Sequence, residues 1–482
     1  MKRILIALSV VVAVPVFAQT GMHPVSARNM ALAGSAGITM KGWEAVGINP
    51  AALGQYEASR YVIGIAPAGG MVGNTNLNID FYNTYFTGET VNGKKVRYDL
   101  DKGSRKKEFL SNFDPDNTVF ASGAVQVLAF SMDYAPWGSF AVTWGYKGEG
   151  HALLTRGLFD RMLNGVEPGG SYDLSGMGGE AQIRSEFALN YSRSVDEWVK
   201  IPYLSKLSAG AALKIENGVT YLSVENASHS LSVDPETSEY THSFVYEIRG
   251  AGNNDFSRLI DQTLVDDEML PFISPNAGFG LGLDLGVAGE VAGWPVFLSV
   301  TDIGYIDWDK NATLLTDKET IVFTPGYTND DGNTGSTFEV DTLKSTYEPI
   351  RRKTSFTSYL PTTLRMGTRV SLNQFALITE YQKQWNIPGE FIAYAGYQQG
   401  LNEGPGNSYI PQLSLGLEWT LKGWYARLGQ AFGARDGYNF GLGGGYSHPR
   451  FRIDAGSAYF HHLFTGDSRT RLSAAITSQI FF

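Results

Sequence analysis

The sequence contains no cysteine in its 482 residues. This absence excludes disulfide bonds, thiolate nucleophiles and zinc sites built from cysteine. Basic residues are also in the minority, with 38 Lys and Arg against 48 Asp and Glu and a formal net charge of −10. Because nucleic acids are bound by basic surfaces, no nucleic-acid partner is expected.

Long hydrophobic runs are missing as well. No segment after residue 18 approaches the roughly 18 continuous apolar residues that a membrane-spanning helix needs. The N-terminus has a shorter apolar run, Ile4 to Val14, which follows Lys2 and Arg3 and precedes a small-residue cleavage pattern ending at Ala18. This pattern predicts a secretory signal peptide over residues 1–18, cleaved near Ala18. A secreted chain without a helical anchor can still reside in a membrane as a β-barrel.

The sequence is instead rich in segments in which apolar residues alternate with small or polar ones. Successive side chains of a strand point to opposite faces, so each segment predicts a strand with one apolar face. Glycine, with 56 residues, and aromatic residues, at 13%, are abundant, as in barrels with aromatic girdles at both membrane interfaces. The alternating segments include residues 61–66, 140–146, 183–191, 207–216, 278–287, 364–370, 413–419 and 472–482.

Charged residues are too few for these strands to form a soluble barrel. Only 18% of the residues are charged, whereas a soluble barrel would carry many charges on its outer faces. The sequence therefore predicts an all-β fold, a transmembrane antiparallel β-barrel of about 14 strands over residues 58–482. Short links near Pro136, Asn373, Lys422 and Pro449 are expected in the periplasm. Long extracellular loops are expected at 87–118, 148–182, 226–275, 305–359 and 385–408.

Two segments do not fit the even strand number that bacterial barrels have. Glu216 to Gly218 resembles a hairpin turn inside a predicted strand, and we interpret it as a bulge. Phe391 to Tyr397 resembles an extra strand, and we interpret it as part of a loop hairpin above the membrane.

The segment of residues 19–57 precedes the first strand and does not alternate. Ser26 is placed to cap a short helix that Gly34 ends. A second capped turn begins at Asn49, because Asn is favoured at the N-cap and Pro50 at the first helical position. The Asn49 side chain is expected to accept a hydrogen bond from a first-turn N–H. The segment cannot fold alone, so we expect it to lie in the barrel lumen as a hatch.

The barrel, the hatch and the motif Asn49-Pro50-Ala51 together resemble the FadL-like superfamily of outer-membrane barrels. That resemblance implies passive uptake of hydrophobic or amphipathic small molecules, such as long-chain fatty acids, past the hatch. The stretches 300–310 and 360–373 resemble a Bacteroidota-type branch without assigned function. Phe482 resembles the terminal aromatic residue of outer-membrane barrels, which implies recognition by the barrel-assembly machinery. The expected location is the outer membrane of a Gram-negative cell, in contact with its lipid.

Four arginines on predicted lumen faces are candidates for binding an anionic head group such as a carboxylate: Arg365, Arg369, Arg427 and Arg452. The alternative is that these arginines pair across strands with acidic residues such as Glu186, Glu418 and Asp454. The wider group of FadL-like barrels also includes proteins of secretion and attachment. A binding or secretion-adaptor barrel, with a partner protein at its extracellular loops, is therefore the alternative function.

No catalytic, cofactor or metal site is predicted. The segment Gly88 to Lys95 approaches a phosphate-binding loop but lacks the Ser or Thr that would hold Mg²⁺, so a polar hairpin tip is the better interpretation. The pair His461-His462 has no partner at the spacing of a zinc site. No G-x-S-x-G motif is present, and the chain is not expected to be an enzyme.

The segment that starts at Asp307 has the spacing of a calcium loop only in part. Asp307, Asp309 and Asn311 match the first three ligand positions, but Ala312 and Lys318 occupy the sixth and twelfth. We interpret the segment as a loop that leaves the membrane, with weak surface calcium binding as the alternative.

Overall fold

Strands make up most of this chain, and they join edge to edge into a closed ring. The computed structural model describes residues 25–53, 61–74, 89–91, 94–96, 103–111, 117–134, 137–157, 159–160, 169–173, 175–237, 239–252, 276–323, 350–434, 437–463 and 471–482. The predicted signal peptide lies outside these residues. None of the described helices is long and apolar enough to cross a membrane.

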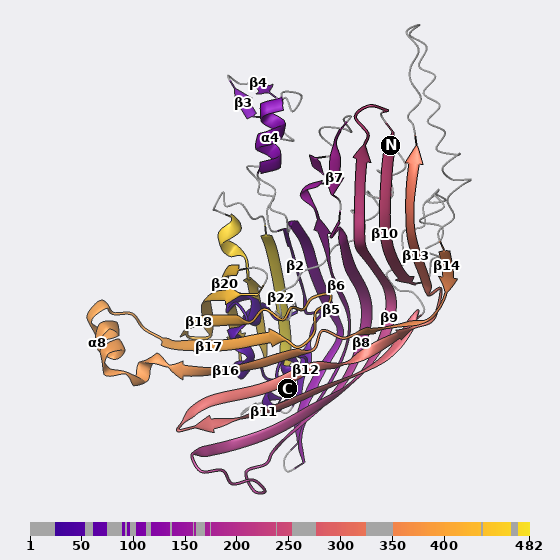
Figure 1. Cartoon of the computed structure of the whole chain (residues 1–482). Coiled ribbons are helices and arrows are strands. Elements are labelled where there is room, and N and C mark those ends of the chain that lie inside the picture. The colour runs from indigo at the N-terminus through magenta and orange to yellow at the C-terminus, as the bar shows by residue number, and fades with distance from the viewer. Residues whose placement is uncertain are drawn as a thin grey trace.

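The ring is an antiparallel barrel of 14 wall strands (Figure 1). The first wall strand is interrupted and consists of β1 (Tyr61–Gly64) and β2 (Ala68–Asn74), each of which pairs with β5 and with β22. This pairing of the first and last wall strands closes the ring. The other wall strands are β5 (Asn117–Tyr134), β6 (Gly138–Leu154), β8 (Gly178–Ser194), β9 (Leu204–Val233), β11 (Gly278–Val291), β12 (Trp294–Trp308), β16 (Thr363–Ser371), β17 (Glu390–Gly400), β18 (Gln412–Leu421), β19 (Trp424–Gly433), β20 (Gly437–His448), β21 (Phe451–Ser457) and β22 (Arg471–Phe481).

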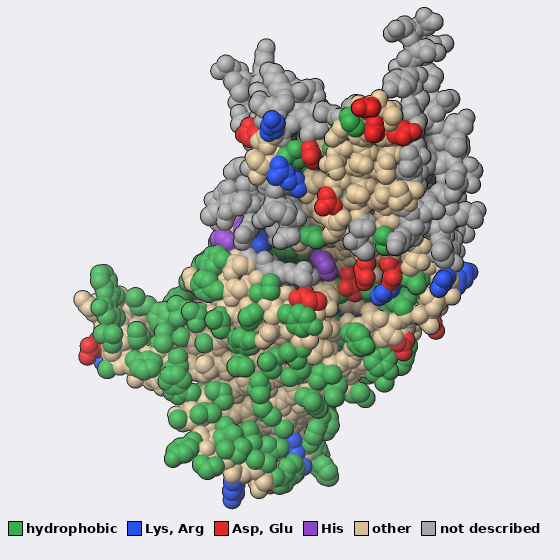
Figure 2. Space-filling model, in the orientation of Figure 1, with side chains coloured by type: hydrophobic (Ala, Val, Ile, Leu, Met, Phe, Trp, Pro, Cys, Tyr) green, Lys and Arg blue, Asp and Glu red, His purple; other side chains and the backbone are tan. Residues whose placement is uncertain are grey.

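The apolar face of the strands points outward. In β11 exposed Leu281, Leu283 and Leu285 alternate with buried Gly282 and Asp284, which is the alternation of a lipid-facing wall. Figure 2 shows hydrophobic side chains covering the lower part of the molecule, whereas most of the visible charged residues collect at the top. The predicted transmembrane barrel is confirmed, and its place is the outer membrane.

An aromatic girdle marks one end of the barrel. Exposed tryptophans lie at four links between wall strands at this end, namely Trp137, Trp198, Trp294 and Trp424. Tryptophan is enriched where a membrane meets water. Short links are periplasmic in bacterial barrels, so this end, which also holds Phe482, is the periplasmic end.

At the other end, strands rise far beyond the membrane. β9 has 30 residues, whereas a tilted transmembrane strand needs about 9–11. Its first part pairs with β11 and its last part with β10. An outer sheet therefore stands on the wall; it contains β7 (Ser171–Asp173), β10 (Tyr240–Ala251), β13 (Thr313–Phe323) and β14 (Ile350–Lys353), and β15 (Phe356–Tyr359) pairs with the outer end of β12. A small hairpin of β3 (Glu89–Val91) and β4 (Lys94–Val96) and the helix α4 (Gly103–Ser111) also lie at this end.

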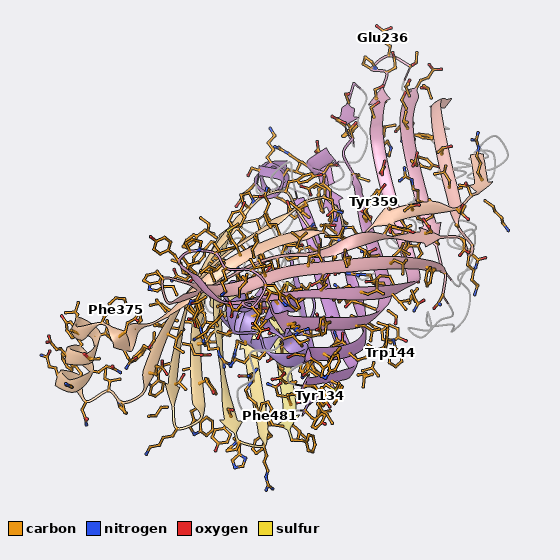
Figure 3. All side chains as sticks on the ribbon, turned by 90° about the horizontal axis from the view of Figure 1, so that it is seen from below. Tyr134, Trp144, Glu236, Tyr359, Phe375 and Phe481 are labelled. Atoms are coloured by element: carbon orange, nitrogen blue, oxygen red, sulfur yellow. The ribbon has the colours of Figure 1, made fainter. Side chains whose placement is uncertain are left out.

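The hatch fills the lumen. It contains α2 (Ala27–Ala31), η1 (Ser35–Thr39), η2 (Gly42–Ala45) and η3 (Pro50–Ala52), and nearly all of residues 25–53 are buried. Ser26 Oγ accepts the N–H of Asn29 at 3.2 Å, so the predicted cap of the first helix is confirmed. Figure 3 shows these short helices inside the ring of strands.

Two details of the predicted topology are wrong, and one is confirmed. Phe391 to Tyr397 lies within β17, which pairs along its length with β16 and β18, so it is a wall strand and not a loop hairpin. The outer connection after it therefore contains only residues 401–411. The periplasmic link near Asn373 is not short, because it contains the helix α8 (Ala376–Trp385). Glu216 to Gly218 lies inside β9, next to a register shift, as the bulge interpretation expected.

Candidate functional site

The hatch rests directly on glycines of the wall. A Cβ atom added to Gly210 would lie 2.4 Å from the carbonyl oxygen of Pro50, and one added to Gly456 would lie 2.3 Å from the carbonyl oxygen of Ala27. Real Cβ contacts are never this short, so the backbone of the hatch fits only because the wall has no side chain there. Gly429 and Gly441 make the same close approach to α2 and the residues that follow it.

The turn Asn49-Pro50-Ala51 is held by hydroxyl groups of the wall. Ser192 Oγ and Ser208 Oγ both donate to the carbonyl oxygen of Ala51, at 3.0 and 3.1 Å. Ser299 Oγ donates to the carbonyl oxygen of Ile48 at 2.7 Å. These bonds satisfy backbone groups that a buried turn would otherwise leave unpaired.

The hydrogen bond predicted for the side chain of Asn49 is wrong. Asn49 precedes η3 in an extended conformation, and its side chain makes no capping hydrogen bond. Because η3 is a tight 3₁₀ turn, the N–H of Ala52 already donates to the backbone carbonyl of Asn49 at 3.0 Å. Among the described residues, neither the oxygen nor the nitrogen of the Asn49 amide has a hydrogen-bond partner, although the residue is fully buried.

The start of the hatch is bonded to the last strand of the barrel. The N–H of Ala27 donates to Thr477 Oγ1 at 3.0 Å, and the same hydroxyl donates to the carbonyl oxygen of Val25 at 3.0 Å. Thr477 lies on β22 and faces the lumen. The start of the described hatch and the last wall strand therefore meet inside the barrel.

Ion pairs connect the other side of the hatch to the wall. Glu44 of the hatch accepts from Arg452 at 2.5 Å, and Arg28 of the hatch lies 3.9 Å from Glu418. These pairs belong to a buried group that we call the hatch ion-pair cluster. It consists of Arg28, Glu44, Glu418, Arg427, Arg452 and Asp454.

Charges balance within the hatch ion-pair cluster. Arg427 donates to Glu418 and to Asp454, both at 2.5 Å, and Arg452 also donates to Asp454 at 2.6 Å. Three arginines thus face three carboxylates, and each arginine has an acidic neighbour. Removing one member of such a buried group leaves an uncompensated charge, which is strongly unfavourable.

A second buried group of charges fills the lumen closer to the outer end. Lys214 lies 2.9 Å from Asp284 and 2.7 Å from Asp302, while Arg184 lies 2.9 Å from Glu216. Carboxylate oxygens of Glu186, Glu216 and Asp302 lie within 4.8 Å of one another. Lysine and arginine side chains pair with all three carboxylates. Lys147, which lies 2.6 Å from Glu186, and Glu149 complete it.

The four candidate arginines divide into two kinds. Arg427 and Arg452 are members of the hatch ion-pair cluster, as the pairing alternative expected. Arg365 is buried, and its Nη1 donates to Thr301 Oγ1 at 2.5 Å. Arg369 lies four residues closer to the periplasm than Arg365, opposite Tyr394 of β17, and is half-buried. Among the described residues Arg369 forms no ion pair, so its guanidinium is the best placed of the four to meet a ligand.

The wall surface that the hatch covers is largely apolar. On one side, Ala288, Phe297 and Tyr394 of the wall pack against Leu32, Ile38, Met40 and Ile48 of the hatch. On another side, the wall residues that pack against the hatch are Val62, Ala129, Ala141 and Ala188, and the hatch residues are Trp43, Val46 and Leu53. Moving the hatch would therefore expose these apolar side chains of the wall to the lumen.

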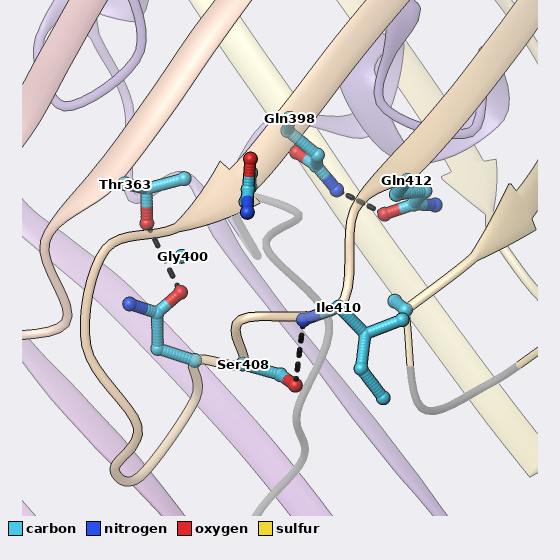
Figure 4. Close-up of a pocket in the computed structure, with 9 residues that line it drawn as sticks. Thr363, Gln398, Gly400, Ser408, Ile410 and Gln412 are labelled. Carbon is cyan, nitrogen blue, oxygen red and sulfur yellow. Dashed lines mark hydrogen bonds between the residues drawn. The ribbon is translucent and has the colours of Figure 1, made fainter.

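A small polar pocket lies where the hatch faces the outer end of the barrel. Thr363, Gln398, Gly400, Ser408 and Gln412 line it (Figure 4). Gly34 at the end of α2 lies beside the Gln398 side chain. The cavity has a volume of about 10 Å³, which is enough for a single ordered water. This pocket, lined by wall strands and the connection 401–411, is therefore not a ligand-sized chamber.

A family model named "Family of unknown function (DUF5723)" matches residues 50–455, which is most of the chain. The chain belongs to the DUF5723 family. No curated protein matches the sequence. The match begins at the Pro50-Ala51 turn and ends within β21, so β22 and most of the hatch lie outside it, and it does not assign the chain to a Bacteroidota-type branch.

Solved structures with a similar fold include outer-membrane channels. The Pseudomonas putida toluene transporter TodX is 11% identical, with a TM-score of 0.43, and the match covers 95% of this chain and 98% of TodX. The monoaromatic hydrocarbon channel CymD is 10% identical, with a TM-score of 0.34, and the match covers 97% of this chain and 99% of CymD. The translocator domain of the autotransporter NalP from Neisseria meningitidis, at 9% identity and a TM-score of 0.30, is matched over 89% of this chain and 91% of its own. At such distances the function has to be argued from this barrel's own residues.

Proposed function

We propose that this protein is a hatch-gated outer-membrane channel for the passive uptake of hydrophobic or amphipathic small molecules. The observation that carries the proposal is the apolar wall under the hatch. Ala288, Phe297 and Tyr394 of the wall are buried in one cluster with apolar residues of the hatch. When the hatch moves, these side chains line the opening, and an apolar solute restores the burial that they lose.

The hatch is held by contacts that can break and re-form. Hydrogen bonds from serines and a threonine, two ion pairs with the wall and close packing on glycines fix it. Without cysteine, no disulfide bond locks the hatch to the wall. A plug fixed in this way suits a gate, whereas a barrel with a purely structural role has no need of a separable plug.

The proposed ligand has an anionic head group and an apolar tail, as a long-chain fatty acid has. Arg369 lies on the lumen face next to Tyr394, which belongs to the apolar patch under the hatch. A carboxylate bound by the Arg369 guanidinium would leave its tail along Phe297 and Tyr394. Arginine suits this role because its planar donors match a carboxylate.

The test is uptake into proteoliposomes that contain the folded barrel. A fluorescent long-chain fatty acid should enter faster than it enters protein-free vesicles, whereas a sugar of similar mass should not. Arg369→Gln should slow fatty-acid entry but leave an uncharged hydrocarbon unaffected. The matched control is Arg450→Gln, an exposed arginine at a periplasmic turn. Equal entry of fatty acid with and without the barrel would refute the proposal.

The outer sheet favours a second candidate function, the binding of a partner protein. β9 and β10 rise well beyond the membrane, and their connecting turn is ordered by Asp234. The N–H groups of Thr237 and Glu236 donate to the Asp234 carboxylate and hold its pKa below the usual range. A protein that co-purifies in stoichiometric amount, without bound lipid, would favour this function over uptake.

Two further expectations are part of the proposal. The channel acts without catalysis, and lipase activity that disappears when one Ser or His is changed would contradict this. The assembly machinery reads the C-terminal strand, where Phe482 follows β22 and exchanges backbone hydrogen bonds with Tyr61 of β1.

A further inference from the structure

The periplasmic link between β16 and β17 carries a helix that stands outside the barrel. α8 (Ala376–Trp385) extends away from the wall in Figure 1, and Figure 3 shows Phe375 far from the ring of strands. The other periplasmic links in the described part of the chain are short turns or coils. This helix lies outside the lumen and takes no part in holding the hatch.

One face of α8 carries large exposed apolar side chains. Leu377, Tyr381 and Trp385 are spaced four residues apart, so they form one stripe along the helix. They are 63%, 54% and 68% exposed, which is unusual for large apolar side chains in water. Lys383 lies on the opposite face, whereas Glu380 follows Leu377 by three residues and flanks the stripe. The helix is thus amphipathic, with its apolar side uncovered.

The orientation of α8 is fixed by hydrogen bonds at its base. Asn373 Nδ2 donates to Gln382 Oε1 at 2.8 Å, and Gln382 Nε2 donates to the carbonyl oxygen of Gly389 at 2.9 Å. The N–H of Phe391 on β17 donates to Asn373 Oδ1 at 2.7 Å. These bonds join the helix to both strand ends, so the apolar stripe is presented in a defined direction.

The stripe continues an interface that the rest of the barrel already defines. Trp137, Trp198, Trp294 and Trp424 form the periplasmic aromatic girdle at the ends of four other hairpins. Trp385 extends this girdle at the hairpin of β16 and β17. In Figure 2 the hydrophobic cover of the barrel runs on to the arm at the left that α8 forms. The surface next to the stripe is therefore the lipid-facing surface.

We propose that α8 is an interfacial anchor whose apolar stripe inserts among the phospholipids of the inner leaflet of the outer membrane. An amphipathic helix of this kind lies in the plane of the interface, with its apolar face about 5–10 Å into the boundary between head groups and acyl chains. Lys383 then faces the periplasm. The inference is independent of any transport activity.

The anchor has a consequence for the hatch. β16 and β17, whose ends α8 joins, pack against η1 of the hatch, and Gly396 of β17 lies against Ser35. Inserting α8 into the leaflet fixes the position of this hairpin relative to the membrane. β16 and β17, which carry Arg369 and Tyr394, are thus the wall strands that this anchor fixes relative to the membrane.

Spin labelling tests the proposal directly, because the chain has no cysteine and one introduced cysteine is a unique site. Nitroxide labels are placed at Tyr381→Cys and Trp385→Cys, and on the opposite face at Lys383→Cys as the matched control. The folded full-length barrel is reconstituted in vesicles of phosphatidylethanolamine and phosphatidylglycerol. Collision rates with oxygen, which partitions into lipid, and with a neutral nickel chelate, which stays in water, are then measured for each label.

The expected result is a severalfold higher ratio of oxygen to nickel collisions at positions 381 and 385 than at position 383. Equal ratios on both faces would overturn the proposal, since the stripe would then lie in water. Protection of 381 and 385 from both reagents would also overturn it, because a protein or a second copy would cover the stripe. Leu377→Cys replaces either apolar position if its labelled barrel loses heat-modifiable gel migration.

Discussion

Gly210→Ala should displace the hatch without destabilising the barrel wall. Gly210 lies in β9, where an alanine is compatible with the extended backbone. The new methyl group would meet the carbonyl oxygen of Pro50 at 2.4 Å and the backbone nitrogen of Ala51 at 2.6 Å. Ordinary contacts begin near 3.4 Å, so the turn has to move by about 1 Å.

The size of the effect follows from the cost of overpacking. Inserting one methyl group into a well-packed site costs about 1–3 kcal/mol. Because about 1.4 kcal/mol corresponds to a factor of ten, the seated hatch should lose a factor of about 5–140 in population relative to displaced states. Pro50 and Ala51 backbone atoms are the ones in contact, so rotation of a side chain cannot relieve the clash.

The assay is ion conductance per folded barrel in planar bilayers, with folding verified by heat-modifiable gel migration. Gly210→Ala should conduct more than the wild type. Gly123→Ala is the matched control, because a Cβ there meets its nearest atom, the carbonyl oxygen of Gly69, at 3.7 Å. If Gly210→Ala does not fold, Gly456→Ala tests the same idea on the other side of the hatch. Wild-type conductance in both folded variants would refute the reasoning.

Three further variants probe other contacts of the hatch. Glu44→Gln removes the charge that faces Arg452; breaking a buried pair costs about 3–5 kcal/mol, so conductance should rise, whereas Glu236→Gln in the exposed outer turn should leave it unchanged. Asn49→Ala should leave conductance at the wild-type level, since the side chain makes no cap; a rise matching the 0.5–2 kcal/mol of a lost cap would contradict the structure. Pro50→Gly should raise it, because the turn loses its fixed φ.

The parts of the fold that rest on local pattern were predictable. Alternation alone is enough to identify a strand such as β11, because each residue's face depends only on its neighbours. β17 was misassigned because the rule of an even strand number works only if each connection is placed on the correct side of the membrane. The link before it contains α8, and its length made an inner connection resemble an outer one.

The site was predictable only where partners are close in sequence. Arg427 and Glu418 lie on adjacent strands, and the pairing alternative anticipated them. Arg452 pairs with Glu44 across 408 residues, which no strand pattern can reveal. A carboxylate within the mildly apolar hatch was the available signal. The role of Asn49 was wrongly predicted because Asn is common at helix N-caps. In this tight turn no backbone N–H is left to donate a hydrogen bond to its side chain.

The bonds between Thr477 and the start of the hatch bear on how the barrel is made. Ala27 and Thr477 are 450 residues apart, so their contact can form only after almost all of the chain has been synthesised and folded. β22 is also the strand that closes the ring against β1 and β2. The start of the hatch therefore cannot be bonded in place before the strand that closes the ring is present.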